Sequence, residues 1–223
     1  MLKSTLVACI LVLLLPLVLL PTGSVGAADP EVVILDDFNT GLSPHWQQEE
    51  FKGQTDYRVV ADGEEMVLRG ESNGTASALV YPKKFLLQDY PILSWRWKIA
   101  DVLPKGDARS KSGDDYAARI YVVFPHWFAP KTRSINYIWA NKLPKGVLLP
   151  NSYTSNSMLV AVQSGRENIS RWINERHNVY EDYRRIFGEE PRPVGAIVIM
   201  TDSDDTRGHS LAWYDDLRLE RKR

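Results

Sequence analysis

The segment 114–124, whose sequence is DDYAARIYVVF, carries one arginine among three aromatic rings. Because side chains of an extended chain alternate between its two sides, Arg119 and Tyr121 share one side, and Tyr116 and Ile120 share the other. Burying an unpaired cation costs several kcal/mol. We therefore expect the side of Tyr116 and Ile120 to face the core, and Arg119 to face a polar groove or water. A guanidinium in such a groove can bind a carboxylate or phosphate through two parallel hydrogen bonds.

The segment 92–99, ILSWRWKI, repeats this alternation. Trp95 and Trp97 share one face and are expected in the core, whereas Arg96 and Lys98 share the opposite face. The segment therefore predicts a strand with an aromatic core face and a cationic outer face.

The two segments predict a single binding patch if their strands are neighbours in one sheet. The patch would hold Arg96, Lys98, Arg119 and Tyr121, with a stacking surface from Tyr137 or Trp139. Such a surface suits an acidic sugar or another anionic envelope ligand. The alternative is an internal ion-pair network, in which the guanidinium is matched by acids from elsewhere in the chain: Asp114, Asp115 or Asp202.

Acidic doublets are candidates for cation binding, and the chain has three: Asp36-Asp37, Asp114-Asp115 and Asp215-Asp216. One member of each doublet points inward in an extended chain, and an inward carboxylate needs a cation or hydrogen-bond donors to offset its desolvation. Calcium is the natural cation for exported carboxylates, so Asp37 and Asp216 are candidate ligands of a structural calcium ion. The alternative, which is the more common role, is that these acids cap turns or pair with arginine.

Two loops contain candidates for presenting side chains to a ligand, although the alternative is favoured for each. The acidic loop 202–206 follows a buried strand, and Asp202 and Asp204 are candidate binding residues, with a solvated turn as the alternative. Arg207 stands where an EF-hand requires glycine, which excludes that motif. In the segment 125–130, PHWFAP, Trp127 is the best candidate for an exposed ring. The alternative is that this loop packs back on the core.

The histidines are isolated in the sequence, and no pair has the spacing of a zinc site. His177 lies near Asp182, so these two are candidate acid–base or ligand-binding residues, with a lone surface histidine as the alternative. The chain has no G-x-S-x-G motif, no Gly-rich phosphate loop and no dinucleotide fingerprint. It also lacks the paired carboxyls of the E-x-D-x-x-E strand, which argues against a retaining glycosidase of that type.

Roughly ten short strands, separated by hairpin or loop signals, predict an all-β protein. We expect a jelly-roll-like antiparallel β-sandwich with one inserted helix over residues 179–187, where the apolar spacing becomes helical and Gly188 supplies a C-terminal cap. Neither a repeat nor a domain boundary is evident, so residues 29–223 are expected to form a single domain.

The N-terminal residues 1–28 have the pattern of an export signal: a short basic start, an apolar run over 6–20, and small residues before a cleavage point. The alternative is an uncleaved anchor, but the run is short for a membrane span.

Cleavage removes Lys3, which changes the balance from 27 Lys and Arg against 28 acids to 26 against 28. That balance argues against a nucleic-acid-binding surface. Cys9 is the only cysteine, so the mature chain has none, which fits a bacterial periplasm.

The sequence resembles a known family at five motifs: SWRWKI, GDDYAARIYVVF, YIWAN, EDYRRIFG and IVIMTDSDDT. The family consists of uncharacterised bacterial exported proteins, catalogued as Domain of Unknown Function 3047. The resemblance implies a stand-alone envelope domain and gives no activity. The strands ILDDF and WYDDLRL also resemble the first and last strands of galactose-binding-like jelly-roll domains, some of which hold calcium.

From these observations we expect a periplasmic or secreted module that binds a carbohydrate or another polar envelope ligand without catalysis. A polysaccharide hydrolase or lyase is one alternative, using His177, Tyr183 or an Asp from the acidic loop. A structural partner in an envelope complex is another.

Overall fold

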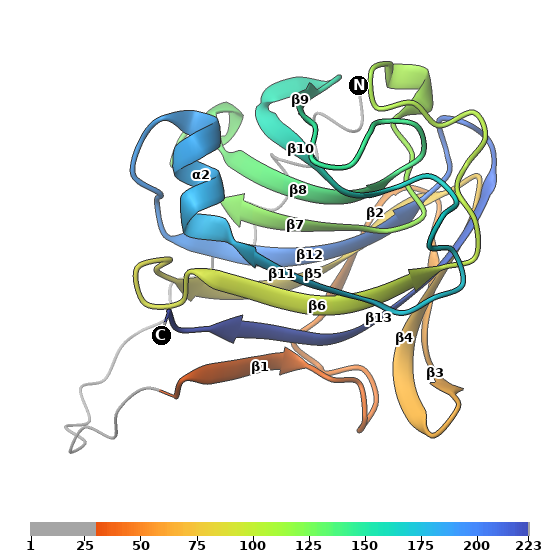
Figure 1. Cartoon of the computed structure of the whole chain (residues 1–223), viewed down its shortest axis with the longest axis horizontal. Coiled ribbons are helices and arrows are strands. Elements are labelled where there is room, and N and C mark those ends of the chain that lie inside the picture. Colours follow the sequence, from red (N-terminus) through yellow and green to blue (C-terminus); the bar gives the residue numbers. More distant parts are fainter. Residues whose placement is uncertain (1–29, 223) are drawn as a thin grey trace.

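The computed structural model describes residues 30–222, and its two β-sheets pack face to face (Figure 1). Sheet A has the strand order β11 (Ile173–Asn178), β6 (Ile92–Ile99), β13 (His209–Glu220), β4 (Glu65–Asn73) and β3 (Asp56–Asp62), with β1 (Val32–Asp36) also paired to β13. Sheet B has the order β2 (Gln47–Lys52), β5 (Ala76–Phe85), β12 (Val194–Asp202), β7 (Arg119–Phe124), β8 (Arg133–Ala140), β10 (Thr154–Ser164) and β9 (Leu148–Asn151). The predicted all-β sandwich is confirmed.

Strand pairing departs from the prediction at one place. β8 and β10 run parallel to each other, whereas the other paired strands among residues 30–222 are antiparallel.

The assignment of strands to sheets matters more for the site: β6 belongs to sheet A and β7 to sheet B. The condition for a single patch, that these two strands are neighbours, is therefore not met.

The inserted helix α2 (Val179–Phe187) has the predicted bounds and is the only α-helix in the described part of the chain. The side chain of Asn178 caps its start by accepting a hydrogen bond from the backbone N–H of Glu181, at 3.1 Å. Gly188 ends it in the left-handed conformation, with φ of 69°, which glycine adopts without strain. The helix buries Tyr183 against Phe124, so that it closes one end of the sandwich (Figure 1).

Aromatic rings from the facing sheets form the centre of the core. Trp95 of β6 packs 5.5 Å from Tyr137 of β8, and Trp97 packs 6.0 Å from Trp139, measured between ring centroids. Trp95 and Trp97 therefore lie in the core as predicted. Trp139 is buried too, so the prediction that it offers a stacking surface to a ligand is wrong.

The predicted export signal, residues 1–28, lies outside the described residues. Among residues 30–222, no helix combines the length and the apolar character that crossing a membrane requires.

Candidate functional site

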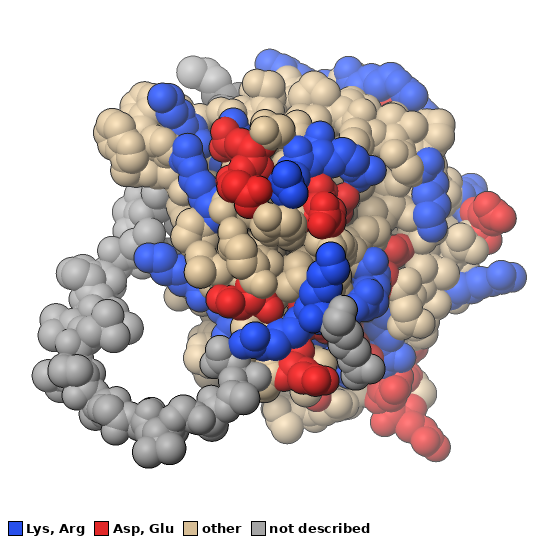
Figure 2. Space-filling model, turned by 60° about the vertical axis from the view of Figure 1, so that its left-hand side comes forward, with Lys and Arg blue, Asp and Glu red and all other residues tan. Residues whose placement is uncertain are grey.

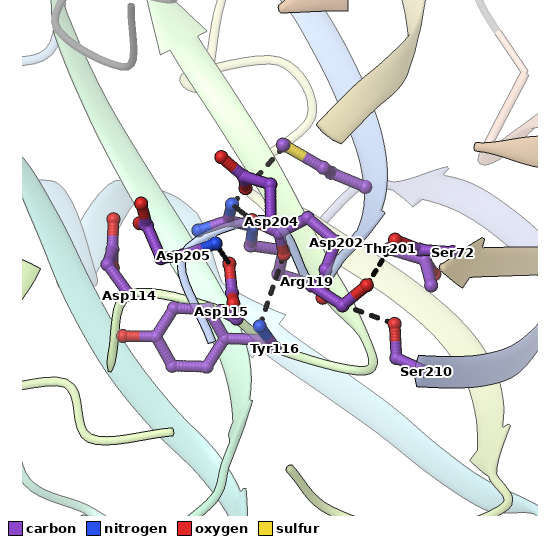
Figure 3. Close-up of polar contacts among 12 residues, drawn as sticks. Ser72, Asp114, Asp115, Tyr116, Arg119, Thr201, Asp202, Asp204, Asp205 and Ser210 are labelled. Carbon is purple, nitrogen blue, oxygen red and sulfur yellow. Dashed lines mark hydrogen bonds and ion pairs between the residues drawn. The ribbon is translucent and has the colours of Figure 1, made fainter. Parts of the chain in front are cut away.

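Arg119 points away from the core between the sheets, as its alternation with Ile120 predicts, but its side chain is only 1% exposed. It forms an ion pair with the equally buried Asp202, the last residue of β12 (Figure 3). Its guanidinium also lies 5.0 Å from the ring centroid of Tyr116 and 5.5 Å from that of Tyr121. Burial alone would lower the pKa of Arg119, but the attraction of Asp202 and its neighbours outweighs it and raises that pKa, so Arg119 stays charged.

Loops seal this side of sheet B above the ion pair. Asp202 accepts a hydrogen bond from the backbone N–H of Tyr116 at 3.1 Å, and the carboxylate of Asp115 accepts from the backbone N–H of Thr206 at 2.6 Å. Asn151 donates to Asp114 at 2.9 Å. The prediction that Arg119 faces an accessible groove is therefore wrong. The alternation of side chains along a strand shows which face a residue is on, but not which loops cover that face.

Several predicted site residues do converge here, but inside the protein. These residues lie in or beside the same buried network, joined by Tyr116: Asp114, Asp115, Arg119, Tyr121, Asp202 and Asp204 (Figure 3). The arrangement corresponds to the alternative of an internal ion-pair network. Tyr116 lies on the side of Arg119 rather than of Ile120, because β7 begins only at Arg119 and the chain bends just before it.

Acidic side chains gather near the same loops. Among residues 30–222, the one group of three potential metal ligands whose donor atoms lie within 4.8 Å of one another is Asp115, Asp204 and Asp205. The carboxylate of Asp115 already accepts backbone hydrogen bonds from residues 205 and 206, at 3.3 and 2.6 Å. Asp204 lies 3.7 Å from the ammonium of Lys52, and Asp205 accepts a hydrogen bond from the Tyr153 hydroxyl at 3.1 Å, so each of the three carboxylates has a protein partner.

The two residues predicted as calcium ligands both have protein partners. Asp37 accepts a hydrogen bond from the backbone N–H of Asn39 at 3.2 Å, which is a turn cap. Asp216 contacts Arg218 at 2.5 Å and Arg96 at 3.5 Å. The calcium site at Asp37 and Asp216 stays a prediction.

The outer face of sheet A is different, because its cations remain in contact with solvent. Arg96 and Lys98 project from β6 away from the core, as predicted, and Arg96 is 17% exposed. The ammonium of Lys98 lies between two half-buried rings, 5.0 Å from Trp172 and 4.7 Å from Trp213. The guanidinium of Arg96 lies 4.8 Å from Trp172. We call Arg96, Lys98, Trp172 and Trp213 the tryptophan platform.

Acidic side chains fix the tryptophan platform in place. Asp62, at the tip of the β3–β4 hairpin, accepts hydrogen bonds from Lys98 at 2.7 Å and from the indole of Trp172 at 2.8 Å. These bonds lower the pKa of Asp62, with Lys98 the main cause. Arg96 donates to Asp215 through Nε at 3.1 Å and to Glu65 at 2.6 Å. Burial raises the pKa of Asp215, although Arg96 opposes this effect.

The sequence reasoning missed both tryptophans. The outward position of Trp213 could have been predicted, because Trp213 alternates with the inward Tyr214 on a strand that the sequence predicts. Register then places it opposite Lys98, which pairs with it across β6 and β13. Trp172 gave no such signal, since it precedes β11 in a stretch that carries helix-like apolar spacing and does not alternate.

His177 and Asp182 meet through Tyr137, at the end of the sandwich that α2 closes. The ring of His177 stacks on that of Tyr137 with centroids 4.8 Å apart, and the Tyr137 hydroxyl donates to Asp182 at 2.8 Å. His177 also lies 3.0 Å from Glu175, a buried carboxylate that no sequence motif indicates. Burial, followed by the charge of Asp182, raises the pKa of Tyr137 and keeps its hydroxyl protonated.

Comparison with known proteins gives a family but no activity. The family described as "Protein of unknown function (DUF3047)" matches residues 44–218, which is most of the chain, and the chain belongs to that family. No curated protein matches.

Several solved structures have a similar chain path. The family 30 carbohydrate-binding module of a Clostridium thermocellum cellulosomal cellulase has 9% identity and a TM-score of 0.49, over 85% of this chain and 98% of the module. CBM28, a module specific for non-crystalline cellulose, has 16% identity and a TM-score of 0.46, over 92% and 99%. An adhesin domain of Lys-gingipain from Porphyromonas gingivalis has 12% identity and a TM-score of 0.45, over 86% and 99%.

Proposed function

We propose that this member of the DUF3047 family is a carbohydrate-binding module that uses the tryptophan platform on the outer face of sheet A. The observation that carries the proposal is that Trp172 and Trp213 flank Lys98, with Arg96 beside them, on a surface that solvent reaches. The predicted ligand class is retained, and the binding surface keeps Arg96 and Lys98 of the predicted patch but not Arg119 and Tyr121, which belong to sheet B.

The chemistry of the platform suits a sugar. A pyranose ring presents C–H groups on its faces and hydroxyls around its rim, so an indole can pack against a face while charged side chains bond the hydroxyls. Arg96 and Lys98 supply donors, and Asp62 supplies acceptors. These groups already hold one another in place, which reduces the side-chain entropy lost when a ligand binds.

Rigid elements position the platform. Arg96, Lys98 and Trp213 project from β6 and β13, two central strands of sheet A that are paired to each other. Trp172 directly precedes β11, which pairs with β6 on its other side. Side chains on paired strands keep a fixed spacing, as recognition of a repeating oligosaccharide requires.

A glycan array followed by calorimetry tests the proposal, using cellohexaose, β-1,4-galactotriose and oligogalacturonates with and without calcium. We expect Trp172→Ala and Trp213→Ala each to weaken binding at least tenfold, because each removes a stacking ring. Trp127→Ala is the matched control, since it removes an exposed tryptophan from the other sheet and should bind normally. The absence of binding to every glycan class, or normal binding by both platform variants, contradicts the proposal.

A second candidate function is polysaccharide cleavage, which the contacts of His177 favour. The imidazole lies beside a buried carboxylate and a protonated tyrosine, which is a plausible acid–base set. The test is product release from polygalacturonate and alginate, with His177→Ala as the control. Activity that His177→Ala abolishes supports cleavage, and the absence of products excludes it for these substrates.

We also propose that the chain is exported and works in the bacterial periplasm. The support is the N-terminal sequence pattern alone. Mass spectrometry of the protein from a periplasmic fraction should show a chain beginning after Ala27 or Ala28. Recovery of the intact chain in the membrane fraction contradicts cleavage. Co-purification from the same fraction tests the alternative of a structural partner in an envelope complex.

A further inference from the structure

The loop between β7 and β8, which we call the aromatic loop (residues 125–132), presents two large apolar rings to solvent. Trp127 is 90% exposed and Phe128 is 47% exposed, and their ring centroids lie 5.9 Å apart. Soluble surfaces rarely leave a tryptophan this bare, and an indole beside a second apolar ring is typical of surfaces that meet a partner or a lipid bilayer.

The loop is held in shape, so the exposure of its rings is a property of the fold. The backbone N–H of His126 donates to the Thr132 hydroxyl at 3.2 Å, and the backbone N–H of Phe128 donates to the His126 ring at 2.9 Å. Asn156 donates to the carbonyl of Pro130 at 2.7 Å. Presenting the two rings therefore requires no further ordering of the loop, which favours binding.

Cations outnumber acids around the aromatic loop. Over most of this end of the molecule, basic and acidic side chains intermix (Figure 2). The segments that meet at the loop, 82–88, 125–140 and 191–201, contain no Asp or Glu. Pro125 lines one cavity with Lys83, Lys84 and Gly195, and Glu49 is the single acid in that lining.

Two further cations lie near His126 of the aromatic loop. Desolvation, followed by the charges of Arg192 and Lys131, lowers the pKa of His126, which places both cations near the loop. Both are exposed, and neither is in an ion pair with an acidic residue within 30–222. Arg133, further along the chain, is already paired with Glu189.

We propose that the aromatic loop docks on a bilayer surface that carries anionic phospholipid, with Trp127 and Phe128 entering the interface and Lys131, Arg192, Lys83 and Lys84 meeting the headgroups. Indole and phenyl rings favour the depth of the headgroups, where one edge is apolar and the other is wet. Exposed cations near such a surface add an electrostatic attraction that salt weakens. The excess of cations around the rings favours this partner, because a neutral apolar protein surface offers those cations no opposite charge.

Vesicle co-sedimentation tests the proposal with the chain from residue 29 onward, which contains every described strand and omits the apolar segment 6–20. We expect binding to vesicles of phosphatidylcholine with phosphatidylglycerol, weak binding to phosphatidylcholine alone, and a loss of binding as NaCl rises. Trp127→Ala combined with Phe128→Ala should lower the partition coefficient at least tenfold. Lys131→Gln and Arg192→Gln should each lower it about fivefold at low salt.

The matched control is Ile34→Ala, which removes an apolar side chain that is 54% exposed on β1 of sheet A and should partition as the unmodified protein does. Trp172→Ala should also partition normally, which separates this surface from the glycan site. Equal binding to both vesicle types, no binding to either, or unchanged binding of the Trp127/Phe128 variant overturns the proposal. Glycan binding that depends on Trp127 likewise overturns it, in favour of a second sugar surface.

Discussion

The two sheets carry the same kind of outward cation in two opposite environments. Arg119 of sheet B and Arg96 of sheet A both project away from the core and both have a carboxylate partner, Asp202 and Asp215. Arg119 is 1% exposed beneath loops, whereas Arg96 is 17% exposed beside the half-buried ring of Trp172. The first pair holds loops onto the sheet, and the second belongs to a surface that a ligand can reach. The position of a cation on a strand therefore does not identify a binding site until the covering loops are known.

The largest effect expected from this comparison is on stability. Arg119→Met should lower the free energy of unfolding by about 3–5 kcal/mol, because it leaves Asp202 buried without its cation. Urea denaturation monitored by circular dichroism measures the change. A double variant that also carries Asp202→Leu should recover much of the loss, since no buried charge then remains. A loss below about 1 kcal/mol for Arg119→Met would show that water reaches the pair.

The same substitution in the other sheet should cost less. Arg96→Met removes the bonds to Asp215 and Glu65, but Glu65 is exposed to solvent, and the buried Asp215 keeps a hydrogen bond from the backbone N–H of Asp216 at 2.8 Å. We expect a loss of about 1–2 kcal/mol in the same denaturation experiment, together with weaker glycan binding. Equal losses for the two arginines would remove the distinction between a sealed face and an open one.

The smallest of these effects concerns pH. Bonding to Lys98 and Trp172 holds the pKa of Asp62 below its ordinary value of 3.8. Its contribution to stability is therefore fully present above pH 3.8 and is lost as the pH falls through the lower folded-state pKa. Asp62→Asn should make the free energy of unfolding fall less steeply at acid pH. The difference from the unmodified protein should be less than about 1 kcal/mol, since the carboxylate is partly exposed. Thermal unfolding from pH 2 to pH 6 measures it, and an unchanged acid-side profile would contradict the assignment.

Local chemistry made much of the fold predictable. Asn178 and Gly188 bound the helix, and alternation assigned Trp95 and Trp97 to the core. Strand β2, QQEEFK, was not predicted, because it is a polar strand at a sheet edge and its sequence shows no alternation of apolar and polar residues. Strand β9 was not predicted either, because Pro150 is typical of a loop. Pairing with β10 nevertheless holds the segment extended.

The site was less predictable than the fold, because it depends on which strands become neighbours. Alternation placed Arg96 and Lys98 on an outer face correctly. It gave no means of assigning β6 and β7 to different sheets, or of foreseeing that segments 114–116 and 202–206 fold over Arg119. Trp172 reaches the platform through the pairing of β11 with β6, which is a long-range contact that local sequence does not encode.

Hydroxyl-radical footprinting of the tryptophans tests the central claim most directly, with the tested oligosaccharide that binds most tightly as the ligand. The proposed surface predicts that saturation protects Trp172 and Trp213 from oxidation, while Trp127 is oxidised as readily as in the free protein. Unchanged oxidation of Trp172 and Trp213 in the bound state, with protection appearing at Trp127, would contradict the account.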